Sequence, residues 1–136
     1  MNQSNAAPAS AESYCPHLIF IVDDEPMLVE FAASILQSAG CSVQSFTDPA
    51  LLLKALGESA PKPSLLVTDY DLGLHAMNGL ELIVNCHKIH PSLKTVLASG
   101  TVDGSVTLHH PAKVDRFLSK PYPPAQLRAI VAELLK

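Results

Sequence analysis

The sequence predicts an α/β fold, a doubly wound sheet of five parallel strands in the order 2-1-3-4-5. Short apolar segments alternate with helical segments along the chain. The strand segments are apolar almost from end to end, as in strands that helices cover on both faces. Because crossovers between parallel strands are right-handed, this order is the most economical topology for five such units.

The first two strand and helix units are expected between residues 18 and 58. Leu18–Val22 is a short apolar run that ends in three acidic residues, and a helix begins at Pro26. Gly40 is a suitable left-handed stop for that helix, whose apolar side is expected to carry Leu28, Phe31, Ala32, Ile35 and Leu36. The second strand is Ser42–Phe46, and the next helix begins at Pro49 after a cap at Thr47 or Asp48.

The remaining units follow the Pro-rich break at residues 60–63. Strands are expected at Leu65–Asp69, Lys94–Ser99 and Arg116–Ser119. Helices are expected at about residues 78–90 and 124–135. Residues 101–111, between the fourth and fifth strands, form a poor helix because they include Gly104 and Pro111.

Composition indicates one intracellular domain. Residues 1–16 are rich in Ala, Ser, Pro and Asn without periodicity, so we expect a flexible N-terminal arm before a domain at residues 17–136. The net charge of −4 offers no basic surface to nucleic acid. The apolar runs fall far short of the roughly 20 residues that span a membrane, and no signal segment opens the chain. The expectation is a cytoplasmic protein.

Polar side chains collect at the ends of the predicted strands. Asp23 and Asp24 follow the first strand, Asp69 ends the third, Ser99 ends the fourth and Lys120 follows the fifth. In a doubly wound sheet, ligands bind outside the carboxyl ends of the strands, where the strand order reverses. We therefore expect these five side chains in one site.

The chemistry of that site favours a divalent cation and a phosphoryl group. Carboxylates about 5 Å apart repel by roughly 3 kcal/mol per pair at an effective dielectric of about 20. Lys120 supplies one positive charge, and oxygen ligands suit Mg2+, with Asp24 and Asp69 as direct ligands and Asp23 acting through water. Asp69, at the tip of the central strand, is the best nucleophile toward phosphorus, with Lys120 and Ser99 holding the phosphoryl oxygens.

Four segments resemble the signatures of response-regulator receiver domains, in that family's order and spacing. They are Val-Asp-Asp-Glu-Pro at residues 22–26, Leu-Leu-Val-Thr-Asp at 65–69, Leu-Ala-Ser-Gly at 97–100 and Phe-Leu-Ser-Lys-Pro at 117–121. The similarity covers about residues 17–136 and implies the family's flavodoxin-like fold. By this resemblance Asp69 is the phosphorylated aspartate, Asp23 and Asp24 are the acidic pair around Mg2+, Ser99 is the switch hydroxyl and Lys120 binds phosphate.

The resemblance also implies roles for residues beside these. Phe117 matches the aromatic that swings inward when the switch hydroxyl moves, and the backbone carbonyl of Asp71 matches a third protein ligand of the metal. The side chains of Asp71 and Thr101 match positions that tune the lifetime of the phosphoryl group. The bond between Lys120 and Pro121 matches one that is commonly cis.

The loop after Asp69 departs from the family pattern, because residues 70–79 are about two longer than usual and lack its Met-Pro pair. Counting back from Gly79 would make Asp71 the acceptor, whereas counting along the strand makes it Asp69. We favour Asp69 because a strand fixes its own end more firmly than a loop of variable length does.

The resemblance implies a function in two-component signalling. We expect a single-domain response regulator, not an enzyme, that accepts phosphate from a sensor histidine kinase or histidine phosphotransfer protein and acts on an unknown downstream protein. One alternative is a receiver-like binding module that needs no phosphate. Another is a haloacid-dehalogenase-type phosphatase, whose Asp-x-Asp motif Asp69 and Asp71 resemble, although here the acidic pair precedes that motif.

Overall fold

The five predicted strands are present in the structure, a computed structural model that describes residues 17–136. The predicted N-terminal arm, residues 1–16, lies outside the described residues. The strands are β1 (Leu18–Val22), β2 (Ser42–Phe46), β3 (Leu65–Asp69), β4 (Lys94–Ser99) and β5 (Arg116–Ser119). The helices are α2 (Pro26–Ser38), α3 (Pro49–Glu58), α4 (Gly79–Ile89), α5 (Pro124–Leu134) and a single 3-10 turn, η1 (Gly104–Thr107).

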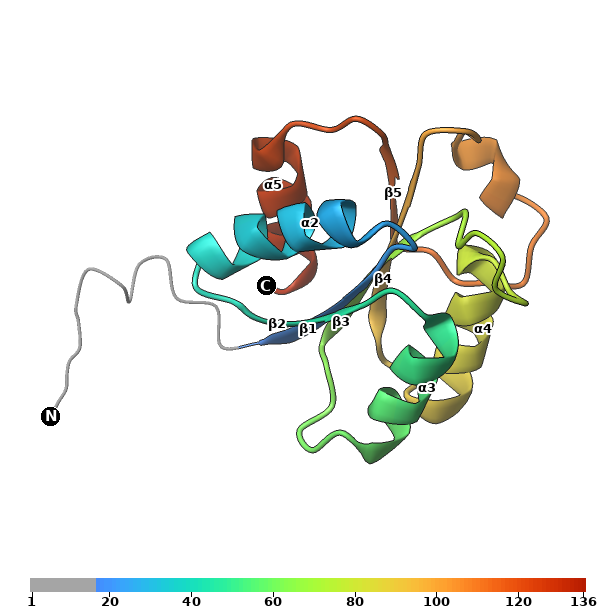
Figure 1. Ribbon diagram of the computed structural model, residues 1–136, viewed down its shortest axis with the longest axis horizontal. Helices are drawn as coiled ribbons and strands as arrows, with labels where there is room; N and C mark the ends of the chain where they lie inside the picture. Colours follow the sequence, from blue (N-terminus) through green and yellow to red (C-terminus); the bar gives the residue numbers. More distant parts are fainter. Residues whose placement is uncertain (1–16) are drawn as a thin grey trace, which may run out of the picture.

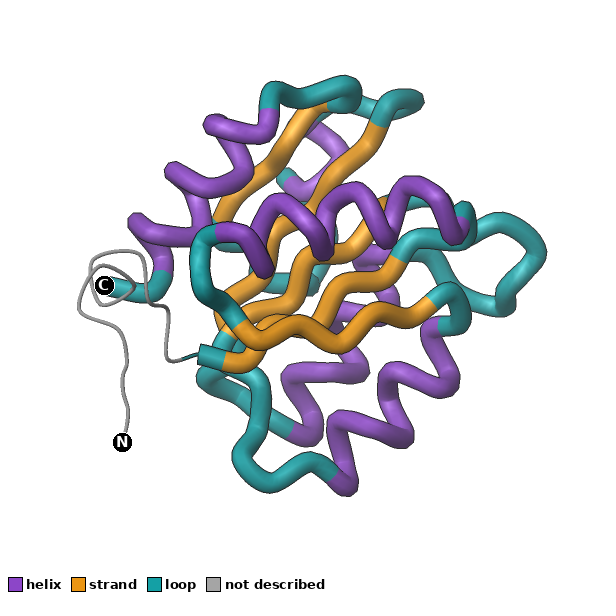
Figure 2. The backbone as a smooth tube through the Cα atoms, turned by 60° about the vertical axis from the view of Figure 1, so that its left-hand side comes forward, coloured by secondary structure: helices purple, strands orange, loops and turns teal. Residues whose placement is uncertain are grey.

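All neighbouring strands are parallel and follow the predicted order β2-β1-β3-β4-β5. Helices α2 and α5 cover one face of the sheet, and α3 and α4 cover the other (Figures 1 and 2). The chain leaves β1 for β2 on one side and later returns to β3 on the other. A crevice therefore opens at the carboxyl ends of β1 and β3.

The sheet separates two apolar clusters because successive side chains of a strand point to opposite faces. Ile19 and Ile21 of β1 pack in the cluster under α2 and α5, whereas Phe20 and Val22 pack in the cluster under α3 and α4. The expectation of strands covered on both faces holds for β1, β3 and β4. The edge strand β2 is mostly exposed, in keeping with its polar sequence.

Local signals position the helix ends. The Asp48 side chain accepts the N–H of Ala50 at 2.8 Å, which selects Asp48 over Thr47 as the cap of α3. Asn78 and Glu81 form a reciprocal capping box at the start of α4. Gly40 has a φ of 92° just after α2, as its predicted role as a left-handed stop requires.

The predicted apolar side of α2 is partly wrong. Leu28 and Phe31 are 41% and 49% exposed, and the buried residues are Val29, Ala32, Ala33, Ile35 and Leu36. Apolar residues occupy more than one side of this helix, so periodicity alone could not decide its rotation. Leu28 and Phe31 border an apolar cavity of about 330 Å³ between α2 and the residues that follow β5.

The segment between β4 and β5 forms little helix, as predicted. Its only regular element is η1, which begins after Asp103, whose side chain accepts the N–H of Ser105 at 2.9 Å. Among the helices of residues 17–136, none has both the length and the apolar character that crossing a bilayer would require.

The start of α4 is packed so closely against the end of β3 that Gly79 has no room for a side chain. A β-carbon there would lie 2.3 Å from the carbonyl oxygen of Asp69 and 2.9 Å from Cδ1 of Leu97. We predict that Gly79→Ala lowers the free energy of unfolding by about 1–3 kcal/mol, measured by urea denaturation. Gly57→Ala is the control, because a β-carbon at Gly57 meets no atom within 4 Å. Equal stability of Gly79→Ala and the wild type would contradict this packing.

Candidate functional site

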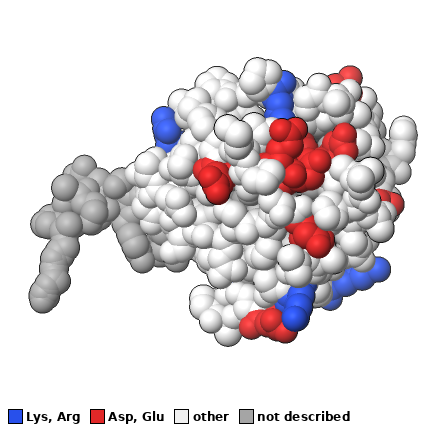
Figure 3. Space-filling model, viewed as in Figure 1, with Lys and Arg blue, Asp and Glu red and all other residues white. Residues whose placement is uncertain are grey.

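Acidic side chains gather over the carboxyl ends of the central strands, where Figure 3 shows a dense acidic patch. One carboxylate oxygen from each of Asp23, Asp24 and Asp69 lies within 4.8 Å of the other two. A pocket of about 240 Å³ at this point is lined by Asp24, Asp69, Asp71, Ser99 and Lys120, among others. The structure thus brings together side chains from the ends of β1, β3, β4 and β5, as the strand-end argument predicted.

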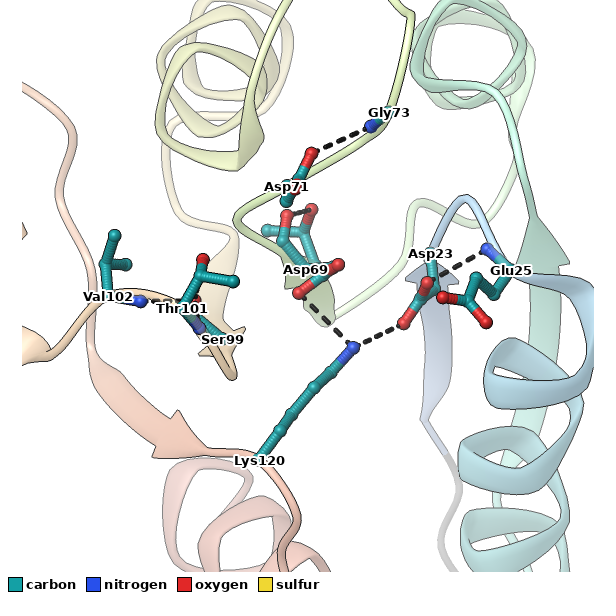
Figure 4. Close-up of polar contacts among 10 residues, drawn as sticks. Asp23, Glu25, Asp69, Asp71, Gly73, Ser99, Thr101, Val102 and Lys120 are labelled. Carbon is teal, nitrogen blue, oxygen red and sulfur yellow. Dashed lines mark hydrogen bonds and ion pairs between the residues drawn. The ribbon is translucent and has the colours of Figure 1, made fainter.

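Lys120 reaches from the end of β5 into the acidic group (Figure 4). Its Nζ donates to Oδ2 of Asp23 at 2.7 Å and lies 3.3 Å from Oδ1 of Asp69. Burial alone would lower the pKa of Lys120, but the bond to Asp23 and the charges of both carboxylates outweigh it, so the pKa is raised. Lys120 therefore stays charged at neutral pH. The bond from Lys120 to Pro121 is cis.

Asp69 is buried and strained electrostatically. Asp69 is 9% exposed. Burial and repulsion from Asp23 and Asp24 raise its pKa from 3.8 to about 6, although the positive charge of Lys120 acts in the opposite direction. At neutral pH most of the molecules therefore carry an ionised Asp69. This carboxylate is available as a nucleophile, yet it is less stable in its charged form than an exposed aspartate.

Asp23 and Asp24, the acidic pair after β1, lie in different environments. Asp23 is 6% exposed and accepts a second hydrogen bond, from the backbone N–H of Glu25 to Oδ1, at 3.0 Å. Asp24 is more exposed, and its pKa is raised by burial and by the neighbouring charge of Asp23. Asp23 is thus held by Lys120 and the backbone, whereas Asp24 faces the 240 Å³ pocket.

Ser99 lies at the end of β4 with its hydroxyl turned to the following loop. Its Oγ accepts the N–H groups of Thr101 and Val102 at 3.0 and 3.1 Å, and lies 3.2 Å from Oγ1 of Thr101. Phe117 is half-buried beside η1, and a β-carbon on Gly104 would lie 3.6 Å from its ring. The loop that Ser99 holds therefore leads within a few residues to the backbone that packs on Phe117.

Asp71 is exposed and stands apart from the three grouped carboxylates. Its Oδ1 accepts the N–H of Gly73 at 3.0 Å, so the side chain closes a turn in its own loop (Figure 4). The N–H of Gly79 donates to the carbonyl of Tyr70 at 2.8 Å. The residues from 71 to 78 therefore project as a loop between Tyr70 and Gly79.

Gly73 was missed by the sequence reasoning. It has a φ of 70°, and a β-carbon on it would lie 2.5 Å from Oδ2 of Asp24. The only signal in the sequence is a glycine in a loop longer than the family's, which does not reveal what the glycine touches.

Comparisons with known proteins identify the family. Residues 19–132 match the response regulator receiver domain. The chain is 30% identical over 122 residues to the nitrogen assimilation regulatory protein NtrX of Azorhizobium caulinodans, covering 88% of this chain and 26% of the relative. It is 30% identical over 120 residues to the DNA-binding response regulator MtrA of Mycolicibacterium smegmatis, covering 87% and 50%. The chain thus spans between a quarter and a half of these relatives.

A solved structure agrees with the fold. The receiver domain protein (CheY-like) from Methanospirillum hungatei superimposes with a TM-score of 0.79 at 25% identity, covering 88% of this chain and 93% of that one. The sheet order and the strand-end site define a receiver of the kind used in two-component signalling. The chain belongs to the response regulator receiver domain family.

The raised pKa of Asp69 predicts how stability depends on pH without a divalent cation. The pKa of Asp69 in the folded protein, about 6, lies above the ordinary value of 3.8. Protonated Asp69 therefore stabilises the fold fully below about pH 4, and this stabilisation is lost as the pH rises through 6. At higher pH the ionised side chain costs up to about 3 kcal/mol, which Asp69→Asn would recover. Urea denaturation in EDTA should show the variant more stable above pH 6, by a margin that shrinks toward pH 4. A margin independent of pH would contradict the raised pKa.

Proposed function

We propose that Asp69 is the phosphoacceptor of this receiver, and that the phosphoryl group comes from a sensor histidine kinase or a histidine phosphotransfer protein. The observation that carries the proposal is the position of Lys120, which lies 2.7 Å from Asp23 and 3.3 Å from Asp69 in a group of three carboxylates. Asp69 is the member of this group that ends the central strand β3.

The donor set fits Mg2+. One lysine offsets only one of three grouped negative charges, and all the grouped ligand atoms are oxygens, which a hard divalent cation prefers. Asp24 and Asp69 would hold the ion directly, together with the backbone carbonyl of Asp71. Asp23 already accepts two hydrogen bonds and would hold a bound water instead. When bound, Mg2+ neutralises charge on the phosphoryl oxygens.

The chain's own residues then account for the transfer. A carboxylate oxygen of Asp69, ionised at neutral pH, attacks phosphorus, and the bond from phosphorus to the donor's imidazole nitrogen breaks as the new oxygen–phosphorus bond forms. The nitrogen keeps the electron pair of the broken bond. Lys120 is placed to hold a phosphoryl oxygen, and its pairing with Asp23 fixes the ammonium beside Asp69 before the donor arrives.

The product changes the balance around Ser99. A phosphoryl group brings a charge near −2 and three strong hydrogen-bond acceptors. Turning the Ser99 hydroxyl toward it sacrifices the two bonds from Thr101 and Val102, each worth about 1 kcal/mol net. A hydrogen bond to a charged acceptor is worth about twice as much, so the two arrangements are close in energy. We infer that phosphorylation shifts this equilibrium, and that Phe117 and α5 form the surface that signals it.

The alternative functions fit the site less well. A phosphatase of the haloacid-dehalogenase type would need the second aspartate of its motif to act on the substrate, but the carboxylate of Asp71 is used to close the turn at Gly73. A binding module that needs no phosphate gives no specific role to a half-buried lysine that pairs with two aspartates. We therefore favour a signalling module over an enzyme.

Intact-mass measurement tests the proposal. We expect the wild type, incubated with Mg2+ and acetyl phosphate, to gain the mass of one phosphoryl group. Asp69→Asn should abolish this gain, and Asp71→Asn should retain it, because asparagine keeps the oxygen that accepts the N–H of Gly73. Loss of labelling in Asp71→Asn but not in Asp69→Asn would move the acceptor to Asp71. No labelling of a folded wild type would favour the phosphate-independent module.

A further inference from the structure

We propose that Gly73 is a positioning residue of the metal centre: only a residue without a β-carbon lets the lengthened loop close over the site while Asp24 keeps its carboxylate beside Asp23 and Asp69. The inference rests on the proposed function, because it concerns the same Mg2+ site. It assigns a role to the extra residues of this loop, which have no counterpart in the family pattern.

The loop is fixed at several points although much of it is exposed. Leu72 is 2% exposed and packs in the apolar cluster under α3 and α4. The carbonyl of Tyr70 accepts the N–H of Gly79 across the base of the loop. Nδ1 of His75 lies 3.7 Å from Oδ1 of Asp48, at the start of α3. The position of Gly73 is therefore determined by neighbours on both sides.

The turn that contains Gly73 is itself specified. Oδ1 of Asp71 accepts the N–H of Gly73 at 3.0 Å, and the φ of Gly73 is 70°, a left-handed conformation that glycine adopts without steric cost. The side chain of Asp71 thus stabilises the turn, and the turn places the backbone of Gly73, which has no side chain, against the acidic group.

Contact with Asp24 is the decisive observation. A β-carbon on Gly73 would lie 2.5 Å from Oδ2, 3.3 Å from Cγ and 3.5 Å from Cβ of Asp24. The side of Asp24 that runs from Cβ to Oδ2 therefore lies against the glycine, and a methyl group cannot share this space with the present orientation of Asp24. In a Gly73→Ala protein either the Asp24 side chain rotates or the loop retreats. Rotation withdraws a carboxylate from the group of three, and retreat moves Asp71, whose backbone carbonyl is the third proposed ligand.

Mn2+ binding measures the effect without requiring phosphorylation. Mn2+, as the paramagnetic substitute for Mg2+, would be titrated against the purified proteins and followed by electron paramagnetic resonance. We expect Gly73→Ala to bind at least about tenfold more weakly than the wild type, the range typical when the residues that orient metal ligands are changed. Gly40→Ala is the matched control, because Gly40 also has a positive φ, 92°, but lies beyond the far end of α2. It should bind Mn2+ as the wild type does.

The outcomes separate this inference from the proposed function. A wild type that does not bind Mn2+ would count against the proposed site itself. A wild type that binds, beside a Gly73→Ala protein that binds equally well, would overturn the role of Gly73 alone.

A second measurement covers the case in which Gly73→Ala is too unstable to titrate. The cost of Gly73→Ala in the free energy of unfolding would be measured in the wild type and in Asp24→Ala, which lacks the carboxyl group that the new methyl meets. We expect a smaller cost in the Asp24→Ala background, and an equal cost in both backgrounds would overturn the proposed contact.

Discussion

The site depends on two ion pairs that share one cation, the ammonium of Lys120, which lies between Asp23 and Asp69. Three carboxylates converge because parallel strands end at one edge of the sheet, and a single lysine cannot offset them all. Burial, together with the remaining negative charge, raises the pKa of Asp69 and of Asp24. The fold thus maintains an excess of negative charge at the point where the strand order reverses, and a divalent cation can offset it.

Hydrogen bonds link the acidic site to the loop that leads to η1. Lys120 follows β5, and its backbone N–H donates to the carbonyl of Ser99 at 2.8 Å, so the ends of β4 and β5 are linked directly. The Ser99 hydroxyl holds the start of the loop that leads to η1, and η1 packs on Phe117. This loop forms only one 3-10 turn, so its hydrogen bonds are less regular than those of the longer helices.

The fold was largely predictable because strong local signals separate its elements. Pro26 and Pro49 start helices, and Gly40 follows the end of α2, so the strand ends and the side chains they carry could be located from the sequence. The exposure of Leu28 and Phe31 could not be predicted from the sequence, because apolar residues occupy more than one side of α2. The contact of Gly73 with Asp24 was also out of reach, since no periodic pattern determines the path of an irregular loop.

The most direct test of the central claim is the titration of the aspartate carboxyl groups by carbon-13 NMR, with and without Mg2+. Our account predicts that Asp69 titrates near 6 without the ion and at a clearly lower pH with it. The exposed Asp103, whose pKa is lowered by hydrogen bonds from Ser105, provides an internal control that should not respond. An Asp69 titration unchanged by saturating Mg2+ would contradict the claim that the three carboxylates and Lys120 form one metal-dependent acceptor site.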